Sequence, residues 1–150
     1  MKDTKTRNIL NKLGTVKQQK AGELYPQDQC IVLDPQAPKP LTPHDFTTYK
    51  IMIVGGLLGY EKPQGRTKAL ITDKASFATR HLGNLQLSID GAVFVIKAIS
   101  LGLKLEDIEI AKEIEIIHDK THSTILPFGY PVIDNTPIIT PGLVEYLARL

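Results

Sequence analysis

The 150-residue sequence lacks tryptophan, contains one cysteine and has no long hydrophobic run. Without tryptophan, and with only five tyrosines and four phenylalanines, it shows no aromatic platform for stacking single-stranded nucleic acid. The single Cys30 excludes a disulfide framework within the chain and favours a reducing compartment. Because Cys30 opens a short apolar run, we interpret it as a buried packing residue rather than a nucleophile.

Membrane insertion is not expected from this sequence. The longest apolar run, from Ile51 to Tyr60, contains three glycines and is too short to span a bilayer. The N-terminal residues are basic, but the apolar stretch of a secretory signal peptide does not follow them. We therefore expect a cytoplasmic protein that is not associated with membranes.

The composition is that of an ordinary globular domain, with 42% hydrophobic and 23% charged residues. Its length fits a single domain over residues 1–150. The net charge of +2 is unevenly distributed, because residues 1–20 carry six basic side chains and one acid. This segment is either a solvated terminal helix or a basic arm that reaches RNA or an acidic partner.

Strand-like runs alternate with glycine turns and helical patterns through the middle of the chain. The spacing predicts an α/β domain with a mostly parallel sheet and flanking helices. Ser88 is placed to cap the central helix, and Thr42 to cap a short one that begins near Asp45. The predicted strands are 30–33, 51–54, 85–87, 114–117 and 124–126, and the predicted helices are 6–13, 89–101 and 143–150.

A glycine-rich turn directly after the second predicted strand is the first candidate ligand site. Gly55-Gly56-Leu57-Leu58-Gly59 would let the backbone turn sharply and approach a ligand closely. Its spacing matches neither the dinucleotide-binding fingerprint nor a P-loop. A tight strand-to-loop turn remains the alternative interpretation.

The second candidate is the segment 80–90, which leads into the N-terminus of the central helix, where free N–H groups favour an anion. Within this segment, Asp90 could simply stabilise the helix, and His81 could be a core histidine.

The third candidate is Arg66, in a loop after the glycine turn, where it could hold a carboxylate. His118 and His122 lack further metal ligands nearby, so no metal site is expected.

Taken in order, these segments resemble one specific family, the SPOUT-type protein-arginine methyltransferases. Its eukaryotic member modifies a small-subunit ribosomal protein, and it has many archaeal relatives. The resemblance covers about residues 10–150. It is carried by Leu33-Asp34-Pro35-x-Ala37, Leu41-Thr42-Pro43-x-Asp45, Val54-Gly55-Gly56-Leu57-Leu58-Gly59, Pro63-x-Gly65-Arg66-Thr67, Arg80-His81-Leu82-Gly83-x-Leu85-Gln86-Leu87-x-x-Asp90-x-Ala92-Val93, Leu126-Pro127-Phe128 and Pro141-Gly142-Leu143.

The resemblance implies a sheet whose C-terminal part threads a trefoil knot, and S-adenosylmethionine (SAM) bound in that knot. Carried over residue by residue, it also implies three cofactor loops, with backbone groups recognising adenine. The implied cofactor-binding residues are Gly55, Gly56, Leu57, Gly59, His81, Leu82, Gly83, Leu85, Ser88, Ile89, Leu126, Pro127 and Phe128.

The chain departs from the family pattern in two places. Family members usually carry an acid directly after the glycine run, where this chain has Tyr60 followed by Glu61. Either Glu61 or Asp90 then orients the substrate and accepts its proton, or the methyl acceptor is not an arginine; Arg66 is a further candidate catalytic residue. The family also usually begins with a further strand and helix, and without them we expect an open sheet edge that favours a partner or a homodimer.

Three functions follow from the sequence as hypotheses. The first is SAM-dependent methylation of a protein arginine, with a ribosomal protein as the expected substrate. The second is methylation of RNA, because the basic segment 1–20 suits a phosphate backbone. The third is a non-catalytic SAM-binding protein that has lost the chemistry near Tyr60.

Overall fold

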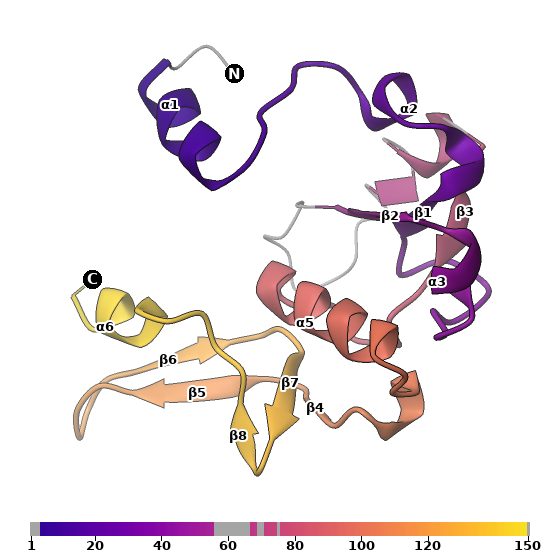
Figure 1. The fold of residues 1–150 in the computed structure, drawn as a ribbon. Helices are drawn as coiled ribbons and strands as arrows, with labels where there is room; N and C mark the ends of the chain where they lie inside the picture. The colour runs from indigo at the N-terminus through magenta and orange to yellow at the C-terminus, as the bar shows by residue number, and fades with distance from the viewer. Residues whose placement is uncertain (1–3, 56–66, 69–70, 75, 150) are drawn as a thin grey trace.

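The computed structural model describes residues 4–55, 67–68, 71–74 and 76–149, and Figure 1 shows how the elements are arranged. The α-helices are α1 (Thr4–Leu13), α2 (Ala21–Leu24), α3 (Asp45–Thr48), α5 (Ile89–Ser100) and α6 (Leu143–Leu147). Short 3₁₀ helices cover Gln27–Gln29, Thr72–Lys74 and Leu105–Asp107. The strands are β1 (Cys30–Leu33), β2 (Ile51–Val54), β3 (Ala78–Arg80), β4 (Ile110–Ala111), β5 (Ile114–Ile117), β6 (Ser123–Leu126), β7 (Tyr130–Ile133) and β8 (Thr136–Pro137).

The N-terminal half forms a three-stranded parallel sheet in the order β2-β1-β3, which confirms the predicted parallel α/β arrangement for this half. All four residues of the central strand β1 are buried, as their continuous apolar run predicts. The apolar run 51–54 would also suit a buried strand, but the residues of β2 are only partly buried because β2 lies at the sheet edge.

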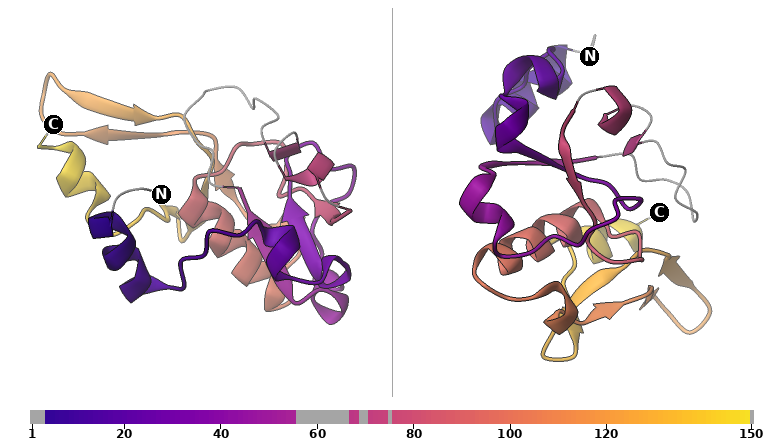
Figure 2. Two further views of the ribbon diagram at one scale, coloured as in Figure 1. Left: turned by 90° about the horizontal axis from the view of Figure 1, so that it is seen from above. Right: turned by 90° about the vertical axis from the view of Figure 1, so that its right-hand side faces the viewer.

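The C-terminal half is antiparallel, so the prediction of a mostly parallel sheet does not extend to it. β5 and β6, which correspond to the predicted strands 114–117 and 124–126, pair as a hairpin, and β4, β7 and β8 form a second small sheet. The turn between β7 and β8 places Asp134 and Asn135 at φ values of 49° and 59°, which Asp and Asn tolerate well. Figures 1 and 2 show the β5–β6 hairpin extending away from the parallel sheet.

The predicted third strand at 85–87 was wrong. The third strand is β3, at Ala78–Arg80, and of residues 85–87 only Leu87 forms a bridge, to Gly129. The apolar side chain of Leu87 packs in the core, so residues 85–87 have the composition of a strand without pairing as one. Smaller corrections apply to α6, which ends at Leu147 rather than 150, and to α3, whose N-cap is His44 rather than Thr42.

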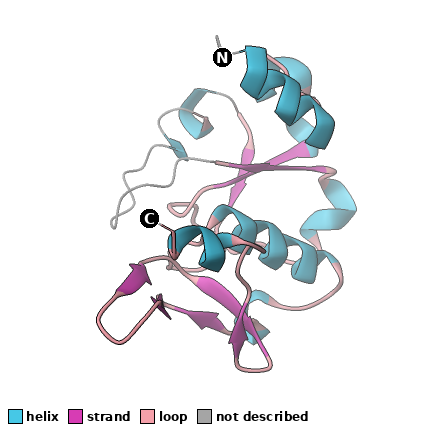
Figure 3. Cartoon of the chain, turned by 90° about the vertical axis from the view of Figure 1, so that its left-hand side faces the viewer, coloured by secondary structure: helices cyan, strands magenta, loops and turns pink. Residues whose placement is uncertain are grey.

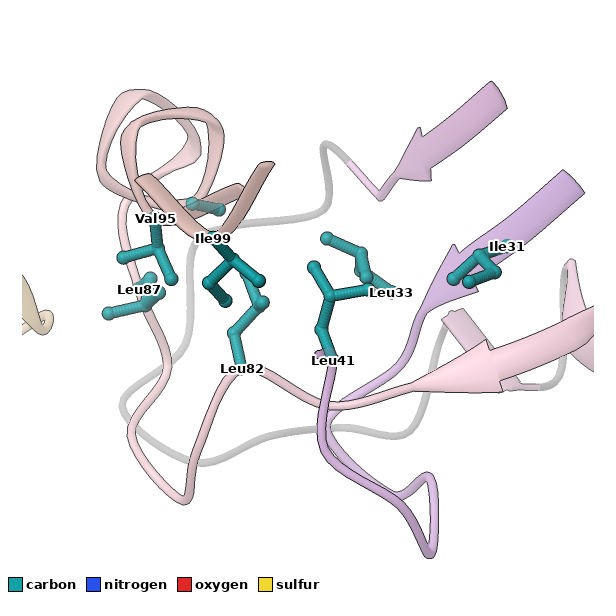
Figure 4. Packing of buried hydrophobic residues seen from close by; sticks show 8 residues of the cluster. Ile31, Leu33, Leu41, Leu82, Leu87, Val95 and Ile99 are labelled. Carbon is teal, nitrogen blue, oxygen red and sulfur yellow. The ribbon is translucent and has the colours of Figure 1, made fainter. Parts of the chain in front are cut away.

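Helix α5 connects the two halves of the molecule. It begins at Ile89 with Ser88 as N-cap, as predicted: the Ser88 hydroxyl accepts a hydrogen bond from the Gly91 N–H. Helix α5 packs against β2 on one side and against β7 on the other. The main core lies between this helix and the parallel sheet (Figure 4), and its buried members are Ile31, Leu33, Leu41, Leu82, Leu87, Ala92, Val95 and Ile99.

A second cluster, of Cys30, Val32 and Phe77, covers the other face of β1. Cys30 is fully buried, which confirms it as a packing residue. Burial, together with the charge of Asp28, raises the pKa of its thiol, so the reactive thiolate is disfavoured.

Helix α1 lies at one end of the molecule, joined to α2 by residues 14–20 (Figures 1 and 3). It confirms the predicted N-terminal helix, and its apolar residues Ile9, Leu10 and Leu13 are exposed. Among the helices that the structure describes, none is long and apolar enough to cross a membrane.

Candidate active site

The carboxyl ends of the three parallel strands meet at one edge of the sheet. Leu33, the last residue of β1, pairs with Val54 of β2 and with Arg80 of β3. Asp34, Gly55 and His81 therefore leave the sheet side by side. In an open parallel sheet this edge is where ligands bind, and two of the predicted cofactor loops begin here.

Gly55 lies against the segment that follows the glycine run. A Cβ built on Gly55 would lie 2.7 Å from the Thr67 hydroxyl, so a larger residue fits only if the Thr67 side chain moves. The remaining predicted residues of this region, Gly56, Leu57, Gly59, Glu61 and Arg66, lie outside the described residues.

Asp34 is a buried carboxylate at this edge that the sequence analysis did not single out. It is 3% exposed. One carboxylate oxygen accepts a hydrogen bond from the Gln36 N–H at 2.9 Å, and the other accepts one from the Thr72 hydroxyl at 2.9 Å. Asp34 thus ties the segment around Thr72 to the end of the central strand.

A buried ion pair supports the end of β3. The Arg80 guanidinium donates to both carboxylate oxygens of Asp45, at 2.6 and 3.1 Å. The Thr42 N–H and hydroxyl donate to the same carboxylate. Burial raises the pKa of the Asp45 carboxyl, but the hydrogen bonds from Arg80 and Thr42 and the Arg80 charge outweigh it and lower the pKa below its ordinary value.

His81 is held in a defined orientation beside Gly83. Its ring Nδ1 accepts a hydrogen bond of 3.1 Å from the Gly83 N–H, so the proton of the neutral ring sits on Nε2. Gly83 has a φ of 94°, which favours glycine, and a Cβ built there would meet nothing within 4 Å. Open space therefore borders the loop at Gly83, while neighbouring Leu82 is buried in the core.

The loop 85–89 meets the segment that ends the β5–β6 hairpin. The Gly129 N–H donates to the carbonyl of Gln86 at 2.8 Å, and the Ser88 N–H donates to the carbonyl of Gly129 at 3.3 Å. This contact brings Leu126, Pro127 and Phe128, which directly precede Gly129, to the loop that contains Leu85. Two predicted cofactor loops that are far apart in the sequence are thus neighbours in the fold.

Ser88 makes its polar contacts within the protein. The Ser88 N–H donates a hydrogen bond to the Gly129 carbonyl, and the Ser88 hydroxyl caps α5. We therefore interpret the role of Ser88 as holding the backbone of the site in place. A Cβ on Gly91 would lie 2.8 Å from the Ser88 hydroxyl and 3.0 Å from the Pro131 ring, so the first turn of α5 packs tightly on β7. Ile89, also a predicted cofactor residue, is 43% exposed beside this turn.

Asp90 lies in the first turn of α5, and its carboxylate accepts a hydrogen bond of 2.6 Å from the Thr140 hydroxyl. Burial raises the pKa of the Asp90 carboxyl, but hydrogen bonds from Thr140, Ser88 and nearby backbone N–H groups outweigh burial and lower the pKa. Burial, with the charge of Asp90, raises the pKa of the Tyr130 hydroxyl. The site therefore contains one ionised carboxylate close to a neutral phenol.

A model of the SFM1-like protein arginine N-methyltransferases matches residues 2–150. The chain belongs to this family.

Yeast SFM1 is similar to this chain both in sequence and in structure. Protein arginine N-methyltransferase SFM1 of Saccharomyces cerevisiae is 31% identical over 131 residues, which cover 85% of this chain and 61% of the relative. The crystal structure of yeast SFM1 complexed with SAM matches with a TM-score of 0.76 at 29% identity, over 82% of this chain and 56% of the other. This SFM1-like chain thus spans about three fifths of the curated relative's length.

A further solved structure, described as a novel protein arginine methyltransferase, matches with a TM-score of 0.75 at 28% identity. The match covers 95% of this SFM1-like chain and 76% of the chain in the solved structure. The likeness confirms a mixed α/β fold with a parallel sheet and flanking helices.

Three residues that the fold brings to the site of this SFM1-like chain were not among the predicted site residues: Asp34, Gln86 and Gly129. Asp34 directly follows the best-marked buried strand, so its position was a usable signal. Gln86 lies within the candidate segment 80–90, but its contact with Gly129 joins segments that are distant in the sequence and leaves no local signal.

No group of three metal-ligating side chains occurs in the part of the chain that the structure describes. His118 forms a hydrogen bond of 2.8 Å with the Thr124 hydroxyl, and His122 forms one of 3.0 Å with the Asp119 carboxylate. Both histidines therefore take part in the polar turn of the β5–β6 hairpin.

Proposed function

We propose that this chain is a SAM-dependent methyltransferase that transfers a methyl group to an arginine side chain of a protein, with a ribosomal protein as the expected substrate. One observation carries the proposal: the loops at His81–Ile89 and Leu126–Phe128 are joined through Gly129, in a chain that matches the family model almost end to end. Structures of yeast SFM1 complexed with SAM and with SAH support SAM as the cofactor.

The described residues fit such a cofactor. Gly83 borders open space at the carboxyl edge of the sheet, whereas Gly55 and Gly129 give room to side chains of the protein itself, Thr67 at the first and Leu87, Ile110 and Leu85 at the second. A glycine next to open space lets the backbone approach a ligand closely. The loops around Gly55, His81–Ile89 and Leu126–Phe128 would hold the cofactor, and their backbone groups would contact its adenosine part.

When bound, the cofactor supplies an activated methyl group on a positively charged sulfur. The protein then has to hold a guanidinium nitrogen in line with that group and to take up its proton. Asp90 is suited to orienting a guanidinium, because its carboxyl has a lowered pKa and stays ionised at neutral pH. Thr140 keeps the carboxylate in place through its 2.6 Å hydrogen bond. Glu61 and Arg66 remain further candidates for this step.

We further propose that residues 1–150 form one SPOUT-type domain with a C-terminal trefoil knot. The meeting of residues 126–129 with the loop 85–88 supports this, since a C-terminal segment has to come back to an earlier loop to form such a knot. A cytosolic location and a homodimer remain predictions from the composition and the open sheet edge.

RNA is the alternative acceptor. The basic segment 1–20 favours it, because clustered lysines and arginines bind phosphates without sequence preference. Protein and RNA acceptors are separated by the assay that follows.

The proposal is tested by calorimetric titration with SAM, followed by transfer of labelled methyl groups. We expect micromolar binding by the wild type, loss of binding in Gly55→Val because of the Thr67 contact, and no loss in Gly14→Val, since Gly14 has open space around it. Label should then reach an arginine-containing ribosomal protein rather than RNA. Absence of SAM binding by a well-folded wild type would reject the proposal, and label on RNA alone would replace arginine by RNA as the acceptor.

A further inference from the structure

Helix α5 carries exposed apolar side chains next to the carboxylate of Asp90. Ile89 and Val93 are 43% and 52% exposed, although the opposite face of the helix packs in the main core. Residues three and four apart on a helix are neighbours, so Val93 lies beside both Ile89 and Asp90. Lys97, which is also exposed, ends this apolar strip one turn further along the helix. The strip therefore borders the carboxylate and is open to solvent.

A second helix brings an apolar side chain to the same surface. The Thr140 hydroxyl bonds the Asp90 carboxylate at 2.6 Å, and the Leu143 N–H donates to the Thr140 carbonyl at 3.1 Å. Helix α6 therefore begins close to the first turn of α5, and Figures 1 and 2 show α6 beyond this end of α5. Val144, in the first turn of α6, is 40% exposed. Exposed apolar side chains from two helices thus border the surface around Asp90.

A carboxylate with an apolar border suits a cation that is attached to apolar groups. A guanidinium can bond to the carboxylate, while the methylene stem of the arginine and the side chain next to it in the substrate pack on the border. Such packing removes apolar area of both partners from water and so contributes to substrate affinity. A polar neighbour of the arginine would gain nothing from this contact.

We propose that this apolar border, formed by Ile89, Val93 and Val144, selects arginines whose neighbours in the substrate are large and apolar. This inference rests on the proposed function and adds a preference of substrate sequence to it. Asp90 binds the guanidinium, and the apolar border binds the side chain beside the arginine. The preference acts on substrate binding, since Val93 and Val144 take no part in the transfer of the methyl group.

The test uses two short peptides that contain one arginine and differ only in the two residues that flank it, leucine or serine. With the wild type we expect a KM about tenfold lower for the leucine peptide, at similar kcat. In Val93→Ser and in Val144→Ser this ratio should fall to about twofold, with the Kd for SAM unchanged. The matched control is Leu101→Ser, which replaces a 69% exposed residue at the other end of α5 and should keep the wild-type ratio.

Each outcome decides the inference. Equal KM values of the wild type for the two peptides would overturn it, and so would a ratio that persists in both valine variants, even if KM rises for both peptides. If the variants do not fold, the methyl resonances of Val93 and Val144 in the SAH-bound wild type should shift when the leucine peptide is added, and no shift would overturn the inference. A wild type that binds SAM but methylates neither peptide would instead reject arginine as the acceptor, and the inference with it.

Discussion

Gly129 donates its backbone N–H to the carbonyl oxygen of Gln86 at 2.8 Å, and Leu87 and Gly129 form a parallel bridge. This contact joins the loop before α5 to the segment after the β5–β6 hairpin. It requires glycine at position 129, because a Cβ there would lie within 3.2 Å of three side chains, those of Leu87, Ile110 and Leu85.

Replacing Gly129 by alanine should therefore separate the two loops. We expect Gly129→Ala to lower the free energy of unfolding by about 1–3 kcal/mol, as overpacking does, and to weaken SAM binding. Urea denaturation and calorimetry measure the two effects. Gly14→Ala is the matched control, since its Cβ would meet nothing within 4 Å, and its stability should stay within about 0.5 kcal/mol of wild type. Wild-type binding by Gly129→Ala would contradict the role assigned to this contact.

Asp90 should matter more for methyl transfer than for cofactor binding. Asp90→Asn keeps the shape of the side chain but removes the charge that orients a guanidinium, so we expect kcat to fall about a hundredfold with little change in the Kd for SAM. Asp107→Asn, at an exposed position, serves as the control. An unchanged kcat in Asp90→Asn would exclude Asp90 from the reaction and leave Glu61 and Arg66 as the candidates.

The ion pair of Asp45 and Arg80 should make the free energy of unfolding depend on pH in the acid range. The lowered pKa of Asp45 means that the unfolded carboxyl takes up a proton first as the pH falls. The stabilisation is therefore complete at neutral pH, declines below about pH 4, and is lost below the folded pKa. Asp45→Asn should lower the free energy of unfolding by about 3 kcal/mol at pH 7, because it leaves Arg80 without its partner.

Urea midpoints at pH 7, 5 and 3 test this dependence. The difference between wild type and Asp45→Asn should shrink toward the acid end. A constant difference across these values would show that the charge of Asp45 does not stabilise the fold.

The hydrogen bond between Thr72 and Asp34 should position the segment that packs on Gly55. Thr72→Val removes the hydroxyl and should cost about 1 kcal/mol of stability and raise the Kd for SAM, whereas Thr72→Ser keeps the 2.9 Å bond and should bind as wild type. Equal effects of valine and serine would attribute the change to packing rather than to the hydrogen bond. Calorimetry at one pH is sufficient to separate the two.

The sequence by itself determined the local elements and the family. The continuous apolar run Cys30–Leu33 marked a buried strand, Ser88 marked the start of α5, and the apolar runs 114–117 and 124–126 marked the two strands of the β5–β6 hairpin. These features depend on side-chain period, on capping and on turn chemistry, which a few adjacent residues define. The ordered motifs placed the chain in its family for the same reason, since each motif is local.

Only the tertiary structure decided which segments meet. Residues 85–87 looked like a strand because their apolar side chains suit one, but those side chains face the core and Gly129, while Ala78–Arg80 completes the parallel sheet. The antiparallel C-terminal half and the anchoring of Asp34 by Thr72 likewise depend on contacts between distant residues. Such contacts leave no periodic signal, because the free energy that selects them comes from packing and pairing across the whole fold.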